Sequence, residues 1–324
     1  MLKLGVEKII LPQLYELQSI LKNLSISYKD ISLLSLTHGQ PATPTTIGKE
    51  FAVYYNRLQQ QLQNLEKIQL TGKLNGASGN YAAAVIAYPN VDWIEFSNNF
   101  INQLGLKPNY LTTQIEPHDT SAQLYDNISR INNIIKNFDQ DIWFYISRKI
   151  FKLKKKEGEV GSSTMPHKVN PIDFENSEGN LGLANCTLRF MSDKLCISRL
   201  QRDLTDSTVL RNQGVALGYS ILAYKNTIKG LNKLEVDEIA SKNELNNNWA
   251  VLAEAIQTVL RKKGYDKPYE KLKELTRGQV IDKKVIIDFL HGLDLDEKEK
   301  RNLLALTPEK YIGLSSQLVD LLLK

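Results

Sequence analysis

Apolar residues recur every three or four positions along most of the chain, which is the spacing that gives an α-helix one buried face. The repeat is most regular in residues 46–70 and 119–150. In the second stretch it is a heptad repeat, with apolar positions at Leu124, Ile128, Ile131, Ile135, Phe138, Ile142 and Tyr145. Long helices with one apolar face need other helices to cover that face. The pattern therefore predicts a bundle of long helices.

Two further stretches carry the helical repeat. Residues 1–24 predict a helix that has no capping residue before its first turn. Residues 207–231 predict another, which includes Gly214 and Gly218, four positions apart. Small residues at this spacing allow close contact with a neighbouring helix, and an accidental spacing is the alternative. No stretch alternates apolar and polar residues as a half-buried strand does, and no G-x-G-x-x-G motif follows a strand-like run. The expected fold class is all-α, a long-helix bundle with a smaller helical domain after it.

The character of the chain changes near residue 232, where the predicted helices become shorter and more charged. Glycine and proline separate these helices, which we expect at residues 238–263, 268–276, 283–291 and 307–324. Such a change is typical of a domain boundary. We therefore expect a central bundle domain with the catalytic segments at residues 1–232 and a C-terminal helical domain at 233–324.

The composition adds limits on partners and location. Of 324 residues, 42% are apolar and 24% charged, as in ordinary globular proteins. The net charge of +5 suits an anionic small molecule as well as nucleic acid. The basic run at residues 152–156 is short and lacks interleaved aromatic residues, so we expect no nucleic-acid partner. Two cysteines make no disulfide framework, and no signal peptide or membrane span is apparent, so we expect a cytoplasmic protein with no membrane contact.

Polar segments interrupt the helices, and the first two carry candidate chemistry. His38 lies in residues 37–44, a rigid turn with two prolines. A histidine placed there is a candidate proton donor or acceptor, because its unperturbed pKa lies near neutrality; a histidine that only satisfies the turn is the alternative. Residues 110–119 contain Gln114, whose amide can orient a carboxylate or a base edge, and Asp119, which we expect to cap the next helix.

The third and fourth polar segments suggest anion binding. Residues 157–171 combine glycines and hydroxyl residues with Lys168, and we expect Pro171 in the first turn of a new helix. A loop leading into a helix N-terminus beside a lysine can hold an anion and eases the ionisation of a serine hydroxyl. Residues 199–211 hold three arginines, whose guanidinium groups suit carboxylates and phosphates. A plain Ser/Gly-rich loop and Arg–Asp pairing within the segment are the respective alternatives.

Taken together, these segments resemble a known family. Residues 161–171, Gly-Ser-Ser-Thr-Met-Pro-His-Lys-Val-Asn-Pro, resemble the signature loop of the fumarase/aspartase superfamily, whose members release fumarate by β-elimination. We name these residues the signature segment. Residues 37–44, 174–180 and 198–212 resemble the bacterial form of the adenylosuccinate lyase branch. The resemblance extends over nearly the whole chain, including residues 267–278.

The resemblance implies cleavage of adenylosuccinate to AMP and fumarate, and of the related nucleotide SAICAR to AICAR and fumarate, with no metal or organic cofactor. It implies that Ser162 removes a proton from the succinyl group and that His38 protonates the departing nitrogen. The positions that match the family's succinyl-binding residues are Gln114, Ser163, Lys168 and Asn170. The positions that match residues holding the rest of the substrate are Asn176, Arg202, Ser207 and Arg211, with both arginines and Ser207 placed at the phosphate.

The resemblance carries further expectations. It implies a homotetramer in which each active site gathers residues from several subunits. The family's chains have an N-terminal domain that this sequence lacks, so we expect an incomplete reaction centre and weak turnover by this chain alone. We expect structural or orienting roles for His118 and His167, and we expect His291 to cap a helix.

Two alternatives remain at this level. Another lyase of the superfamily, acting on argininosuccinate or malate, is disfavoured by residues 202–211. A non-catalytic helical scaffold or binding protein derived from the lyases is disfavoured by the joint presence of His38, Ser162, Lys168 and Asn170.

Overall fold

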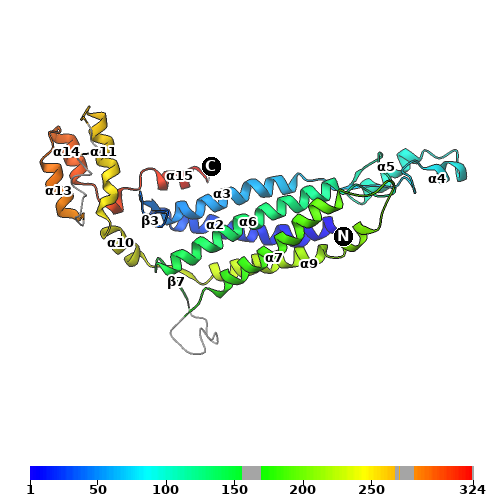
Figure 1. Cartoon of the computed structure of the whole chain (residues 1–324), viewed down its shortest axis with the longest axis horizontal. Coiled ribbons are helices and arrows are strands. Elements are labelled where there is room, and N and C mark those ends of the chain that lie inside the picture. The colour runs from blue at the N-terminus through cyan, green and yellow to red at the C-terminus, as the bar shows by residue number, and fades with distance from the viewer. Residues whose placement is uncertain (155–168, 267–269, 271–280, 323–324) are drawn as a thin grey trace. The chain divides into compact units, whose positions relative to one another are not determined.

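The computed structural model describes residues 1–154, 169–266, 270 and 281–322 (Figure 1). Most of these residues are helical, and the strands among them are two or three residues long. The expected all-α class is therefore confirmed. The chain divides into two compact units, described separately below. The first comprises Met1–Ser19, Asn56–Trp143 and Gly158–Lys233, and the second comprises Ile20–Tyr55, Phe144–Glu157 and Leu234–Lys324. The proposed domain boundary at residue 232 stays a prediction.

Long helices form the core of the first unit. They are α6 (Asp119–Ser147), α7 (Ile172–Leu195) and α9 (Gln213–Leu231), together with parts of α2 (Leu11–Ser27) and α3 (Ile47–Glu66). Helices α7 and α9 pack along each other (Figure 1). The heptad positions of α6 are buried, as the apolar pattern predicted, from Leu124 to Ile142. Burial of this stripe removes apolar surface from water and is the main force holding the bundle together.

Polar side chains also meet inside the first unit, where they connect three helices. Asn132 of α6 donates its amide hydrogens to Asn185 Oδ1 of α7 at 2.9 Å and to Ser220 Oγ of α9 at 3.0 Å. Tyr224 of α9 donates its hydroxyl hydrogen to Asn132 Oδ1 at 2.5 Å. Burial raises the pKa of Tyr224, so its hydroxyl remains protonated and available as a donor. Such satisfied buried groups fix how the helices align, since a slipped helix would leave them without partners.

The predicted helix boundaries hold for some helices and change for others. The stretch 46–70 contains α3, and the stretch 119–150 contains α6. The stretch 207–231 divides at residues 211–212 into α8 (Thr205–Leu210) and α9. Close packing at Gly214 and Gly218 is not observed among the described residues of this chain, because an added Cβ at either position would meet none of their atoms within 4 Å. Small residues there leave open space instead of a tight helix contact.

The N-terminal stretch is helical from Leu2, with one irregular turn. It begins with α1 (Leu2–Gly5), continues as a π-helical turn at Val6–Ile10, and then becomes α2. Within the turn, Val6 and Ile10 are buried. A π-turn adds a residue to the helical repeat, so the apolar face is shifted there without the helix being broken.

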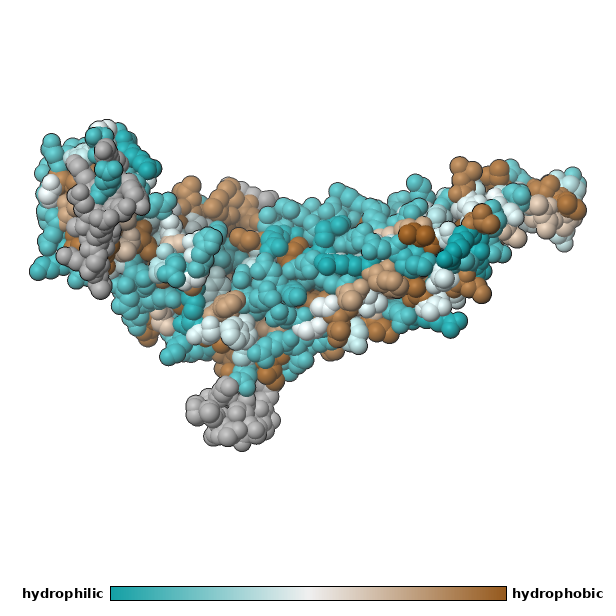
Figure 2. Space-filling view, in the orientation of Figure 1, coloured by the Kyte–Doolittle hydropathy of each residue, from teal (hydrophilic) through white to brown (hydrophobic). Residues whose placement is uncertain are grey.

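Shorter elements complete the first unit. The strand β5 (Thr71–Gly72) pairs in parallel with β6 (Lys107–Pro108), and between them lie α4 (Ala82–Ala87) and α5 (Trp93–Gln103). The side chain of Asp92 caps α5 by accepting hydrogen bonds from two backbone N–H groups. Figure 2 shows apolar residues gathered on the surface of this region, and those exposed are Val85, Ile86, Tyr88, Val91, Ile94, Phe96, Phe100 and Leu104. Neither helix was predicted from the sequence.

The second unit contains short hairpins and the C-terminal helices. Its antiparallel strand pairs join β1 (Ser32–Leu33) with β4 (Thr45–Thr46), β2 (Leu36–Thr37) with β3 (Gln40–Pro41), and β7 (Phe151–Leu153) with β8 (Leu234–Val236). Its C-terminal helices are α10 (Glu238–Asn246), α11 (Ala253–Lys262), α13 (Lys283–His291), α14 (Glu297–Leu304) and α15 (Ser315–Leu321), with 3-10 turns at Trp249–Leu252 and Pro308–Lys310. A cluster that includes Leu252, Ile256, Leu260, Ile286 and Leu290 forms a core of its own.

The C-terminal predictions meet the structure unevenly. The helix at 283–291 coincides with α13. The stretch 238–263 holds α10, a 3-10 turn and α11, and 307–324 holds a 3-10 turn and α15. Of the helix expected at 268–276, all but residue 270 lies outside the described residues. His291 is the last residue of α13, and its carbonyl accepts a hydrogen bond from Lys300 Nζ at 2.9 Å.

Helices long and apolar enough to cross a membrane are not found in the part of the chain that the structure describes.

Candidate active site

His38 stands at the tip of a tight hairpin in the second unit. Thr37 of β2 pairs with Gln40 of β3, so His38 and Gly39 form the two-residue loop. Their φ angles are 54° and 72°. Positive φ at both positions is the geometry of a type I′ turn, which suits Gly39 but is strained for a histidine. His38 is exposed. Strain held at an exposed acid–base residue is typical of a functional position.

Two of the polar segments, residues 110–119 and residues 199–211, meet in the first unit. The backbone N–H of Gln114 donates to the carbonyl of Gln201 at 3.2 Å, and Gln201 directly precedes Arg202 in the chain. Lys73 Nζ donates to the carbonyl of Gln114 at 2.8 Å and to that of Gly76 at 2.9 Å. Burial lowers the pKa of Lys73. The backbone of Gln114 is thus held from both sides while its side chain remains exposed.

Lys73 and Gln201 were not predicted from the sequence. Both act through the backbone of a neighbour, Lys73 on a carbonyl and Gln201 by its own carbonyl. Such contacts leave no residue-type pattern that a sequence could reveal.

The helix start at Asp119 differs from the prediction. Asp119 is the first residue of α6, not its cap. The preceding residue is His118, which has a φ of 65° and whose N–H donates to Glu116 Oε2 at 2.8 Å. Glu116 also accepts hydrogen bonds from Thr71 and Asn109. His118 therefore has a structural position at the entry to α6.

The three arginines of residues 199–211 are of two kinds, paired and unpaired among the described residues. Arg199 forms an ion pair with Asp203, with 3.0 Å between Nη1 and Oδ2. Arg202 and Arg211 are exposed and form no ion pair with another described residue. Hydrogen bonds from the hydroxyl and backbone of Thr205 are the main cause that lowers the pKa of Asp203, with Arg199 contributing less. Pairing within the segment thus accounts for Arg199 and leaves Arg202 and Arg211 for another partner.

The same segment holds a buried carboxylate that the sequence did not single out. Asp206 lies in α8 beside Ser207, which is half-buried. The Oδ1 atom of Asp206 is buried and has no hydrogen-bond partner within the described residues. A buried acceptor without a partner is costly, so this position calls for a donor supplied from outside those residues.

Only the end of the signature segment is described. Ser162, Ser163 and Lys168 lie outside the described residues, as does His167. Asn170 is half-buried. Pro171 is the N-cap of α7 and not, as predicted, its first-turn residue. The shift is one residue, because the ψ of 44° at Pro171 is not yet helical.

Asn176 lies one turn into α7 and is exposed. It lines a hollow of about 410 Å³ together with Ile172, Glu175, Gly179, Asn180 and Leu183. Glu175 is held by Trp143, whose indole N–H donates to Glu175 Oε1 at 3.0 Å. His38 belongs to the second unit. The predicted substrate residues that the structure describes belong to the first unit, and they are Gln114, Asn170, Asn176, Arg202, Ser207 and Arg211.

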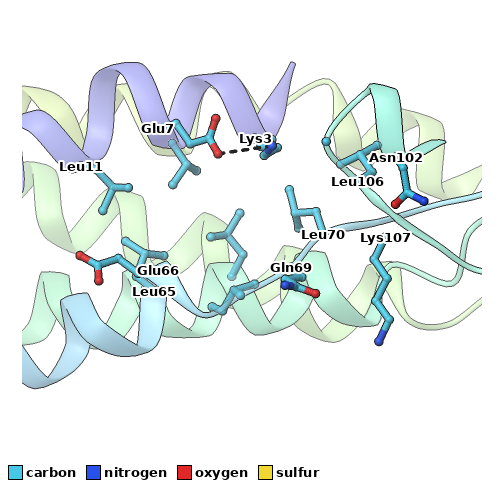
Figure 3. Close-up of a pocket in the computed structure, with 14 residues that line it drawn as sticks. Lys3, Glu7, Leu11, Leu65, Glu66, Gln69, Leu70, Asn102, Leu106 and Lys107 are labelled. Carbon is cyan, nitrogen blue, oxygen red and sulfur yellow. Dashed lines mark ion pairs between the residues drawn. The ribbon is translucent and has the colours of Figure 1, made fainter. Parts of the chain in front are cut away.

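A larger cavity in the first unit contains none of the predicted site residues that the structure describes. It has a volume of about 540 Å³ and lies where the N-terminal helix passes the end of α3 and residues 102–107 (Figure 3). Leu11, Leu65, Leu70 and Leu106 form apolar parts of its wall. Lys3 and Glu7 form an ion pair at its side, with 3.5 Å between Nζ and Oε1. The cavity is a feature of the bundle and is separate from the residues of the candidate site.

No group of three or more His, Cys, Asp or Glu side chains that could hold a metal ion is found among the described residues. Cys186 and Cys196 are both exposed free thiols.

Comparison with known proteins decides the family. The lyase family model matches residues 1–185, and the model described as adenylosuccinate lyase C-terminal matches residues 198–312. The adenylosuccinate lyase of Escherichia coli K12 is 55% identical over 320 residues, covering 99% of this chain and 70% of that protein. The chain belongs to the adenylosuccinate lyase family. The adenylosuccinate lyase of Haemophilus influenzae is 53% identical with the same coverage of both chains.

Two solved structures share the fold of this chain at low sequence identity. A 3-carboxy-cis,cis-muconate lactonizing enzyme from Pseudomonas putida has a TM-score of 0.79 at 21% identity, covering 99% of this chain and 72% of that one. A fumarate lyase from Mesorhizobium has a TM-score of 0.77 at 18% identity, covering 97% and 72%. The predicted adenylosuccinate lyase family, the enzyme class of lyase and the helical fold are thus confirmed. The roles of individual residues stay predictions.

Proposed function

We propose that this adenylosuccinate lyase family member cleaves adenylosuccinate to AMP and fumarate, and SAICAR to AICAR and fumarate. Both reactions are β-eliminations that break a C–N bond. The observation that carries the proposal is the identity of 55% with an adenylosuccinate lyase over nearly the whole chain. Relatedness at this level supports a shared substrate class, a nucleotide that bears a succinyl group.

In the proposed mechanism Ser162 is the base and His38 is the acid. Ser162 removes a proton from the succinyl carbon next to a carboxylate, and the electron pair is delocalised onto that carboxylate. The pair then forms the double bond of fumarate as the C–N bond breaks, and His38 protonates the departing nitrogen. The exposed position of His38 on a strained turn supports this role, because an acid must reach the substrate.

Fixed donors and cations stabilise the charge that develops on the carboxylate. We assign this task to Lys168, Ser163, Asn170 and Gln114. Their effect lies in stabilising the intermediate more than the substrate, which lowers the barrier to elimination. The hydrogen bonds that hold the backbone of Gln114 support its part, because a donor that is already positioned needs no reorganisation during the reaction.

The nucleotide phosphate is bound, in this proposal, by Arg202, Arg211 and Ser207, with Asn176 contributing to the rest of the substrate. Guanidinium groups that have no carboxylate partner are available to an anion. The contrast with Arg199, which is paired with Asp203, supports the choice of Arg202 and Arg211. The metal-free chemistry of the family requires no cofactor in this scheme.

We further propose a homotetramer with shared active sites, working in the cytoplasm. Exposed apolar residues on the long helices support association, since a monomer leaves them in contact with water. They include Leu183 and Phe190 on α7 and Val215 and Leu222 on α9.

The test is to add adenylosuccinate to the purified chain and to follow fumarate release, with the mass in solution measured in parallel. Weak release of fumarate with a mass of four chains is the expected result. Release from argininosuccinate or malate in its place would overturn the substrate assignment. A monomeric mass at working concentration would overturn the shared-site assembly.

A further inference from the structure

A buried ion cluster holds the beginning of α7, the helix that directly follows the signature segment. Asp173 lies in the first turn of α7, and its carboxylate is bound by two lysines from the end of α9 and just beyond it. Lys233 Nζ lies 2.7 Å from Asp173 Oδ2, and Lys229 Nζ lies 2.9 Å from Asp173 Oδ1. All three residues belong to the first unit.

Two of the three charged side chains in this cluster are buried, which is unusual for charged groups. The side chains of Asp173 and Lys233 are 8% and 6% exposed, whereas that of Lys229 is 48% exposed. Lysine is almost never buried unless it is paired. Burial favours a raised pKa at Asp173, but hydrogen bonds from Lys233 and Lys229 outweigh it and lower that pKa. The buried carboxylate is therefore ionised, and the pair forms only in one position of the two helices.

Close backbone packing reinforces the ion cluster. Phe174, next to Asp173, is 1% exposed and lies against Gly230 of α9. An added Cβ at Gly230 would come within 2.7 Å of the Phe174 ring, so only glycine leaves room for the ring. The first turn of α7 is thus held on α9 by charge on one residue and by shape on the next.

The strand before the signature segment is also held by the chain that follows Lys233. Within the second unit, Leu153 of β7 pairs with Leu234 of β8. Lys233 and Leu234 are neighbours in sequence.

We propose that Lys233, acting through Asp173, is a positioning residue that sets the place of Asn170 and Asn176 for substrate binding. The two asparagines lie three residues before and three residues after Asp173. Asn176 lies on the same helix, so a displacement of the first turn moves it directly, and Asn170 is joined to that turn through the N-cap Pro171. The inference rests on the proposed function, in which both asparagines contact the substrate.

Lys263, which lies outside the proposed site, provides a control for Lys233. Lys263 bridges Asp296 and Glu299 in the second unit, with both distances at 2.8 Å. Lys233→Met removes the lysine that contacts Asp173, and Lys263→Met removes the lysine that contacts Asp296 and Glu299. Only the first acts on α7, so only the first is expected to change substrate binding.

The experiment compares Lys233→Met, Lys263→Met and the double variant Asp173→Leu/Lys233→Met with the unaltered chain. Fumarate release gives kcat and KM, calorimetric titration gives the Kd of adenylosuccinate, and thermal unfolding gives stability. We expect Lys233→Met to lower kcat/KM about 100-fold, as a displacement of about 1 Å can, and to weaken binding. Lys263→Met should change stability alone. The double variant removes both buried charges, so it should regain stability but not substrate affinity.

The outcomes separate this inference from the proposed function. Recovery of Kd together with stability in the double variant would show a purely structural role for the pair and overturn the inference. Unchanged Kd in Lys233→Met, measured well below its unfolding temperature, would also overturn it. Lack of fumarate release by an unaltered chain that binds adenylosuccinate would contradict the proposed function, and the Kd values would still decide the positioning role.

Discussion

Thr227 of α9 donates its hydroxyl hydrogen to the carboxyl group of Asp139 of α6, at 2.9 Å from Oδ1 and 3.2 Å from Oδ2. Asp139 is 1% exposed. Thr227 also lies 2.8 Å from the hydroxyl of Ser177 of α7, so the three side chains connect three helices of the bundle. In these contacts Asp139 has hydroxyl groups as its partners. Hydroxyl groups stabilise an ionised carboxylate less than a cationic partner would.

This arrangement predicts that stability falls with rising pH. Burial raises the pKa of Asp139 well above its ordinary value, against the opposing hydrogen bonds of Ser177 and Thr227, and the charge of Glu178 raises it further. The folded chain therefore keeps a proton that the unfolded chain has already released. The free energy of unfolding then decreases as pH rises from the ordinary carboxyl pKa toward the raised one.

Asp139→Asn removes this dependence, since an amide does not ionise. We expect urea unfolding at pH 5 and at pH 8 to show that the free energy of unfolding of the variant, relative to that of the unaltered chain, is higher at pH 8. Asp139→Ala, which leaves the two hydroxyl groups without this partner, should cost about 1–3 kcal/mol. The exposed Asp193 serves as control in Asp193→Asn. An equal response of both asparagine variants to pH would contradict the role of burial.

The hairpin at His38 allows catalysis to be separated from folding. Asparagine readily adopts the positive φ that the turn imposes, so His38→Asn should keep the hairpin and change stability by no more than about 0.5 kcal/mol. Loss of the proton donor should lower kcat about 10²- to 10⁴-fold. Fumarate release and thermal unfolding measure the two effects. His291→Asn, at an exposed histidine outside the site, should leave both unchanged, and normal kcat in His38→Asn would refute the assignment of the acid.

The three arginines of the fourth segment should differ in their effect on substrate binding. Arg202→Gln and Arg211→Gln each remove a charged hydrogen-bond donor to the phosphate, which is worth about 1.5–3 kcal/mol and corresponds to a rise in KM of roughly 10- to 100-fold. Arg199→Gln breaks only an exposed pair with Asp203 and should leave KM unchanged. Steady-state kinetics with adenylosuccinate measures all three. Equal KM values across the series would mean that the phosphate is bound elsewhere.

Two glycines of α9 should respond to alanine in opposite directions. Gly230→Ala brings a methyl group within 2.7 Å of the Phe174 ring and should cost about 1–3 kcal/mol through overpacking. Gly214→Ala enters open space and should stabilise the helix by about 0.5–1 kcal/mol, because alanine loses less backbone entropy. Chemical unfolding of the two variants measures the difference. Destabilisation by Gly214→Ala would show that this position is in contact with another chain.

Prediction from sequence succeeded where one physical cause dominates. The heptad of α6 could be recognised because every turn of that helix buries the same stripe. The turn at residues 37–44 could be recognised because glycine and proline limit the backbone. It missed α5, although Asp92 caps this helix and its apolar residues Trp93, Phe96 and Phe100 follow the helical spacing. It also missed the break at residues 211–212, where the apolar pattern runs on into α9.

The sequence by itself determined the helical class, the family and the residue types available for an acid, a base and an anion site, because periodicity and motif are local properties of the chain. The tertiary structure alone decided which arginine is already paired, which backbone groups hold Gln114, and that Asp173 and Lys233 share a buried contact. The second and third facts depend on distances between residues far apart in sequence, and the first depends on how residues 199–203 fold. A charge acquires its partner, and a carboxyl group its pKa, only when folding removes water and brings other residues against it.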